Sequence, residues 1–171
     1  MGFFDKMKQM ANAVTGGGAK VSLQIGDAAL GQAIPVTVTA MVSDGADLSI
    51  SSVYILLRGL ETAKVDPNKL RGVGGVPTNM DAGKMASSAM GQGRLLDYKV
   101  ESFSGRIDIA GAQKLEAGQT YTFEGEIRLP GGAQGTFIGK HISHQIQAQA
   151  GLDAPGNDPD SGWIDMVVRN G

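Results

Sequence analysis

The feature that most constrains the fold of this chain is a repeated alternation of apolar and polar residues, which begins at Lys20 and recurs almost to the C-terminus. In the stretch 34–42, for example, Ile34, Val36 and Val38 are separated by polar residues or proline. A period of two places one side of an extended strand in a core and the other side in solvent. The runs that predict strands are 21–25, 34–42, 48–57, 98–103, 106–110, 120–129, 137–150 and 163–168.

Short clusters of turn-forming residues separate these runs, at 43–47, 116–118, 130–132 and 153–162. Gly, Pro, Asn and Asp favour such chain reversals. Seven or eight short strands with no helix between them predict an all-β fold, an antiparallel immunoglobulin-like β-sandwich that spans 19–171 as a single domain. A chain of 171 residues can bury a sizeable core without disulfides, and it contains no cysteine.

The N-terminal residues follow a different pattern, with apolar residues at spacings of one, three and four. Phe3, Phe4, Met7 and Met10 share one side of a helical projection, and a run of three glycines follows. This pattern predicts a short amphipathic helix over 1–15. A helix of this length is stable only when its apolar side is docked, so we expect it to pack on the protein's own sheet, on a partner subunit or on a membrane surface.

The segment 61–94 interrupts the alternation. It is rich in Gly, Met, Ala, Ser and Asn and shows no sustained period. Connections of this length within one domain are unusual and tend to be functional or mobile. We therefore expect a mobile insertion in the sandwich.

Charge and composition exclude several classes of function. The chain has 15 Lys and Arg against 17 Asp and Glu, a formal net charge of −2, which argues against a basic nucleic-acid-binding protein. The lack of cysteine excludes thiol nucleophiles, cysteine-ligated zinc and iron–sulfur clusters. No apolar run is long enough to span a membrane, and charged residues occupy the place of a signal peptide's apolar core. These observations predict a cytoplasmic protein.

Catalytic patterns are also missing from the sequence. His141 and His144 are three residues apart in an expected strand, so they point to opposite faces and cannot share a metal ion. No serine lies in a nucleophile motif, and Glu124 and Glu126 fit a solvated strand face. We predict a protein without enzymatic activity, cofactor or metal.

The loop before the last strand carries several oxygen-bearing side chains, those of Asp153, Asn157, Asp158 and Asp160. Such residues are common in turns for backbone reasons alone, and we expect a structural turn. The alternative is a small-molecule or glycan-binding module assisted by calcium, since calcium prefers oxygen ligands. Trp163, the single tryptophan, could serve that alternative, but a lone tryptophan at the start of a strand is expected in the core.

Several stretches of the chain together resemble an arrestin-type lobe. They are 19–21, 30–38, 50–59, 115–123, 126–130 and 141–153, in which an inward strand ends in proline and a long strand leads into Leu152-Asp153. With the Phe-Phe start before Ala-Lys-Val, they resemble the bacterial sporulation-control proteins of the arrestin-like clan.

The resemblance implies a non-catalytic scaffold or adaptor that mediates protein–protein interaction or self-association, in stress or developmental regulation. Arrestins have two lobes, whereas this chain has the length of one. A single lobe could cover its exposed face by forming a two-fold dimer. Phe3, Phe4, Met7 and Met10 are the expected contacts with a protein partner or, peripherally, with a membrane.

Overall fold

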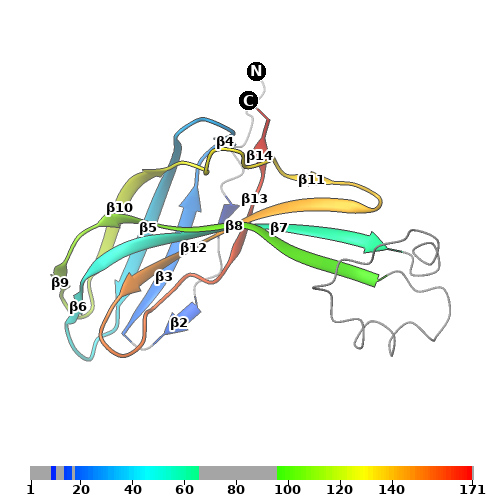
Figure 1. Ribbon diagram of the computed structural model, residues 1–171. Helices are drawn as coiled ribbons and strands as arrows, with labels where there is room; N and C mark the ends of the chain where they lie inside the picture. Colours follow the sequence, from blue (N-terminus) through cyan, green and yellow to red (C-terminus); the bar gives the residue numbers. More distant parts are fainter. Residues whose placement is uncertain (1–8, 11–13, 17, 66–95, 171) are drawn as a thin grey trace, which may run out of the picture.

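The computed structural model describes residues 9–10, 14–16, 18–65 and 96–170, and every regular element among them is a β-strand (Figure 1). One five-stranded sheet has the order β1-β3-β5-β10, with β2 also beside β3. The other has the order β11-β12-β7-β8, with β13 also beside β12. All neighbours within these two sheets are antiparallel, which confirms the predicted antiparallel β-sandwich.

The strands of the first sheet are β1 (Gln9–Met10), β2 (Val14–Gly16), β3 (Ala19–Ile25), β5 (Ile34–Val42) and β10 (Thr120–Ile127). Those of the second are β7 (Ser52–Val65), β8 (Leu96–Ala110), β11 (Phe137–Ile138), β12 (Ile142–Asp153) and β13 (Ile164–Met166). Two small ladders pair β4 (Ala28–Ala29) with β14 (Val168–Arg169) and β6 (Leu48–Ile50) with β9 (Gln113–Leu115).

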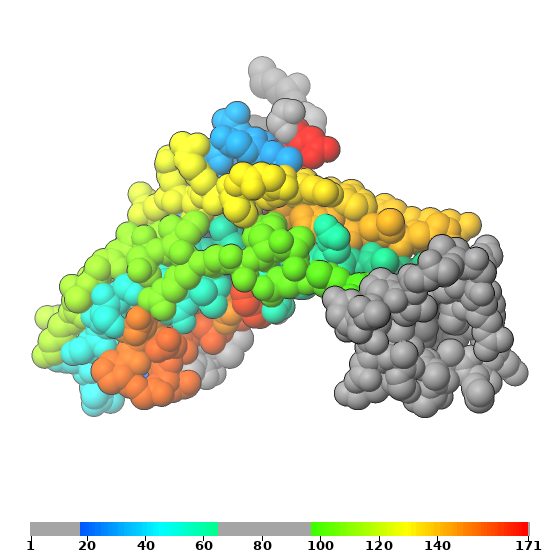
Figure 2. Space-filling view, viewed as in Figure 1, coloured from blue at the N-terminus to red at the C-terminus, as the bar shows by residue number. Residues whose placement is uncertain are grey.

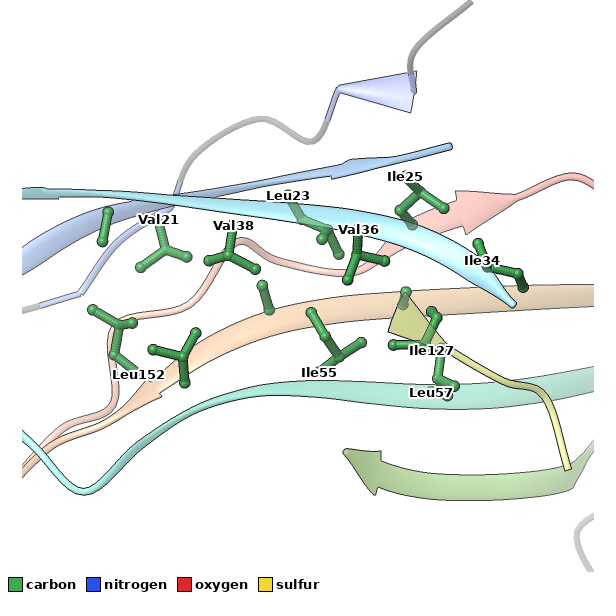
Figure 3. Close-up of a cluster of buried hydrophobic side chains, with 14 of the residues drawn as sticks. Val21, Leu23, Ile25, Ile34, Val36, Val38, Ile55, Leu57, Ile127 and Leu152 are labelled. Atoms are coloured by element: carbon green, nitrogen blue, oxygen red, sulfur yellow. The ribbon is translucent and has the colours of Figure 1, made fainter. Parts of the chain in front are cut away.

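The core lies between the two sheets and follows the alternation of the sequence. Every second residue of β3 and β5 is buried, and these side chains face those of β7 and β12 across the layer (Figure 3). Leu23, Val38, Ile55, Ile146 and Leu152 are fully buried in this layer. Burial of apolar side chains, at about 25 cal/mol per Å², is the main contribution that stabilises such a fold.

The predicted N-terminal helix does not extend over the described residues of the range 1–15. Gln9–Met10 and Val14–Gly16 are strands that pair with β3. The free edge of β3 offers backbone partners, and this tertiary pairing overrides a helical spacing of apolar residues. Residues 1–8 and 11–13 lie outside the described residues, and with them Phe3, Phe4 and Met7.

The predicted insertion at 61–94 begins later than expected. β7 continues to Val65 and β8 begins at Leu96, and these two residues are cross-strand partners. Polar residues such as Glu61 and Thr62 are accommodated here because β7 has β12 on one side and β8 on the other. Residues 66–95 lie outside the described residues, so their predicted mobility stays a prediction.

The two sheets differ in length. β7 and β8 have 14 and 15 residues, whereas β3 and β5 have 7 and 9. The second sheet therefore runs past the first, on the right of Figure 1. We call this extension the arm, comprising residues 60–65, 96–101, 137–138 and 142–145.

Candidate interaction surface

The arm exposes the face that elsewhere in the same sheet forms the core. Ile146 and Ala148 of β12 are fully buried against the first sheet, and Ile142 continues their side of the strand but is 55% exposed. Ile142 lies opposite Ala63, and Ala63 lies opposite Tyr98, so the three side chains share a face. The apolar members of this arm face are Ala63, Tyr98, Val100, Phe137 and Ile142, and all but Ala63 are exposed.

The edge of this sheet is a second exposed feature. β8 pairs with β7 on one side, and no described strand pairs with its other side. Figure 2 shows β8, in green, at the surface of the molecule. An extended edge of 15 residues, about 50 Å long, offers unpaired backbone donors and acceptors to another strand.

His144 lies at the base of the arm and is only 1% exposed, whereas His141 is exposed, as their spacing of three residues predicted. Ser102 Oγ lies 3.0 Å from His144 Nε2, and Gly135 O lies 3.2 Å from His144 Nδ1. Since a carbonyl oxygen only accepts, Nδ1 donates to Gly135, and in the neutral ring Nε2 accepts from Ser102. Phe137 stacks on the imidazole with ring centroids 6.2 Å apart.

The Ser102–His144 pair borders a hollow of about 290 Å³ that Glu61 and the loop 130–134 also line. Hydrolases also contain a serine that is hydrogen-bonded to Nε2 of a histidine, and there a carboxylate usually accepts from Nδ1 and orients the ring. Here the backbone carbonyl of Gly135 accepts from Nδ1 instead. The imidazole therefore links the segment at Gly135 to the sheet. Sequence reasoning missed this pair because Ser102 and His144 come from β8 and β12, with β7 between them.

The end of β12 and the loop after it contain the carboxylates of the alternative binding site, and each of these carboxylates has its own hydrogen-bond partners. Asp153 Oδ2 accepts from Arg106 Nη2 at 2.9 Å, and this hydrogen bond holds the pKa of Asp153 below its usual value. The same guanidinium donates from Nε to Asp108 at 3.0 Å and lies over the ring of Tyr54, 4.1 Å from the centroid.

The remaining carboxylates of this loop shape its backbone. Asp158 accepts from the backbone N–H of Ala154 at 3.0 Å, and Asp160 accepts from that of Gly162 at 2.7 Å. The side chain of Asn157 is exposed. These contacts favour the predicted structural turn, and no group of three or more His, Asp or Glu side chains is placed to hold a metal ion in the part of the chain that the structure describes.

Tyr54 connects this loop to the sheet, and the raised pKa of its hydroxyl predicts a loss of stability at high pH. Burial raises the pKa of its hydroxyl to about 12, and the negative charge of Asp158, to which it donates a hydrogen bond of 3.3 Å, acts in the same direction. Because the unfolded chain releases this proton near pH 10, the contribution of Tyr54 is complete below about pH 10 and is lost as the pH rises toward 12.

Urea unfolding at about pH 9 and about pH 11 tests this expectation. The wild-type chain should lose more free energy of unfolding between the two values than Tyr54→Phe, which has no proton to release. Equal losses in the two proteins would contradict it.

Trp163 was expected in the core, and this prediction is wrong. Its side chain is 37% exposed on the outer face of the sheet, where the guanidinium of Arg58 lies 4.0 Å from the ring centroid. Arg58 also donates to Gln147 at 2.8 Å, which holds it in place. Stacking on a cation stabilises an exposed aromatic ring without burial.

Among the described residues there is no helix with the length and apolarity that a membrane crossing requires. The cytoplasmic location stays a prediction.

Comparison with known proteins gives a likeness in fold. No protein-family model matches the sequence, and no curated protein matches it. Among solved structures, it matches the crystal structure of Spo0M, sporulation control protein, from Bacillus subtilis, with a TM-score of 0.54 and 17% identity. The fold is similar to that of Spo0M.

The alignment covers 90% of this chain and 50% of the Spo0M chain, so this chain spans about half the length of that protein. At this identity the likeness concerns the fold alone. In fold, it agrees with the resemblance of the sequence to sporulation-control proteins.

Proposed function

We propose that this chain is a non-catalytic, arrestin-like interaction domain that binds a protein partner through its arm face and the edge of β8. The observation that carries this proposal is the arm face, because apolar side chains on the core-facing side of the second sheet extend beyond the sheet that would bury them. Contiguous exposed apolar side chains of this kind mark interaction sites.

The rest of the molecule is suited to presenting this surface. The arm continues the strands of a sandwich whose core residues are fully buried, so its position is set by the rigid part of the fold. Phe3, Phe4, Met7 and Met10 remain proposed contacts, with a protein or peripherally with a membrane. Because Spo0M is a sporulation control protein, we extend the proposal to an adaptor in stress or developmental regulation.

A photo-crosslinking side chain at Ile142, introduced in the organism that makes the protein, tests this surface. Met41 is the matched control, since it is 54% exposed against 55% for Ile142 and lies on β5 of the other sheet. We expect light-dependent protein adducts at position 142 and at position 100, and few or none at position 41. Adducts of equal yield at the three positions, or none at 100 and 142, would overturn the proposal.

A further inference from the structure

We propose that the partner of the β8 edge is β8 of a second copy of this chain, paired antiparallel about a two-fold axis at Ser104, with Ser102 as an extra residue outside the pairing. This inference rests on the proposed function and names the partner of that site. The resulting dimer would have a continuous ten-stranded sheet in the order β11-β12-β7-β8-β8-β7-β12-β11, with β13 also beside β12 in each copy.

Charge complementarity along β8 supports a second copy as the partner. In this register Lys99 lies opposite Asp108 of the second copy, and Glu101 lies opposite Arg106 of the second copy. The two-fold axis repeats each pair, and no like charges are opposed. All four side chains are exposed, so they are available for this pairing.

Every other two-fold register of the strand is poorer in charge pairs. An axis through Val100 would oppose Lys99 and Glu101 alone, and an axis through Lys99 would oppose Lys99 to itself and Asp97 to Glu101. The charges of Asp97, Lys99, Glu101, Arg106 and Asp108 oppose each other in two different favourable pairs only when the axis lies at Ser104. Like charges directly opposite each other destabilise a sheet, so this pattern selects one register.

An apolar pair fits the same register. Val100 then lies opposite Ile107 of the second copy. Val100, an exposed member of the arm face, would gain an apolar neighbour.

This match depends on a β-bulge. Directly opposed residues share a face of the sheet, and the four charged residues pair with Tyr54, Leu56, Leu60 and Thr62, at even positions of β7. Val100 and Ile107 pair with Glu61 and Ile55, at odd positions, so they share the other face.

In a regular strand, residues seven apart such as Val100 and Ile107 would point to opposite faces. The register shift between Gly59 and Leu60 leaves Ser102 as an extra residue of β8. Because of this extra residue, Val100 and Ile107 point to the same face. The bulge therefore lies close to the proposed axis, between the opposed residues, where the self-pairing register requires it.

Arg106 also has partners in its own chain, since Asp108, Asp153 and Ser52 accept from it. These contacts use Nε and Nη2 of a group with five N–H donors. They orient the guanidinium, and its remaining donors can bind Glu101 of the second copy.

Covalent trapping tests the register directly, because the chain has no native cysteine. We expect Val100→Cys and Ile107→Cys, mixed and oxidised, to form a disulfide-linked dimer, since opposed Cβ atoms in a sheet lie at about 4.5–5.5 Å. Neither variant alone should do so, because each cysteine would be about seven residues from its copy across the axis. No linked dimer in the mixture, or equal yields in the single variants, would overturn the register.

A charge-swapped variant tests the association in solution. Lys99→Glu with Glu101→Lys keeps the net charge but opposes like charges at all four pairs. We expect the wild type to have twice the chain mass in size-exclusion chromatography with light scattering, and the variant to dissociate with a Kd at least about tenfold higher. Glu126→Arg with Arg128→Glu, an equivalent swap at exposed positions of the other sheet, should leave the dimer intact.

The outcomes separate this inference from the proposed function. A monomeric wild type at high concentration would overturn the second copy as partner, and so would a dimer that resists the swap at 99 and 101. Adducts at Ile142 with other proteins from a monomeric chain would leave the proposed interaction surface intact.

Discussion

Replacing Gly151 with valine is expected to lower the free energy of unfolding by about 3 kcal/mol or more, because the new side chain has no room. Gly151 lies opposite Tyr54, and a Cβ at this position would overlap the ring. Tyr54 cannot swing away freely, since the guanidinium of Arg106 lies on it and its hydroxyl donates to Asp158. In a chain of this size the change corresponds to a melting temperature lower by about 6–12 °C.

The matched control is Gly105→Val in β8, because a Cβ there meets no atom within 4 Å. We expect this variant to differ from the wild type by about 0.5 kcal/mol at most. Adding Tyr54→Ala to Gly151→Val should restore part of the loss, because it removes the ring that the valine overlaps. Equal melting temperatures for the Gly105 and Gly151 variants would contradict the expectation.

The sandwich and most of its core could be predicted from the sequence because alternation reports burial directly. In β5 the predicted inward residues, such as Ile34, Val36 and Val38, are all buried. The local sequence pattern does not predict the correct element where pairing with another strand determines the structure. Gln9–Met10 and Val14–Gly16 have helical spacing but add to the edge of β3, and β7 continues through a polar stretch because strands flank it on both sides.

The candidate surface was less accessible to sequence reasoning. Ile142 and Val100 show the alternation of core residues, and nothing in the sequence indicates that the opposing sheet ends before it reaches them. The bulge at Ser102 is likewise a property of the pairing between β7 and β8. Trp163 is partly exposed and stacks with Arg58, and these residues are far apart in sequence. Whether apolar side chains of one sheet are left exposed depends on where the strands of the opposing sheet end. This is a property of the tertiary structure.

The second large effect is expected at His144, whose replacement by alanine should cost about 2–4 kcal/mol of unfolding free energy. The change leaves Ser102 Oγ and Gly135 O without their partner and opens a cavity beside Phe103 and Phe137. Thermal and urea unfolding measure the loss, which should lower the melting temperature by about 4–16 °C.

His141→Ala is the control for His144→Ala, since it removes the same side chain from an exposed position three residues away. It should change stability by about 0.5 kcal/mol at most. Ser102→Ala alone should cost about 1 kcal/mol, and a double-mutant cycle with His144→Ala should give a coupling energy clearly above zero, because both variants break one hydrogen bond. Additive losses would mean that the two residues act independently. His144 would then stabilise the base of the arm through packing and the Gly135 contact, without Ser102.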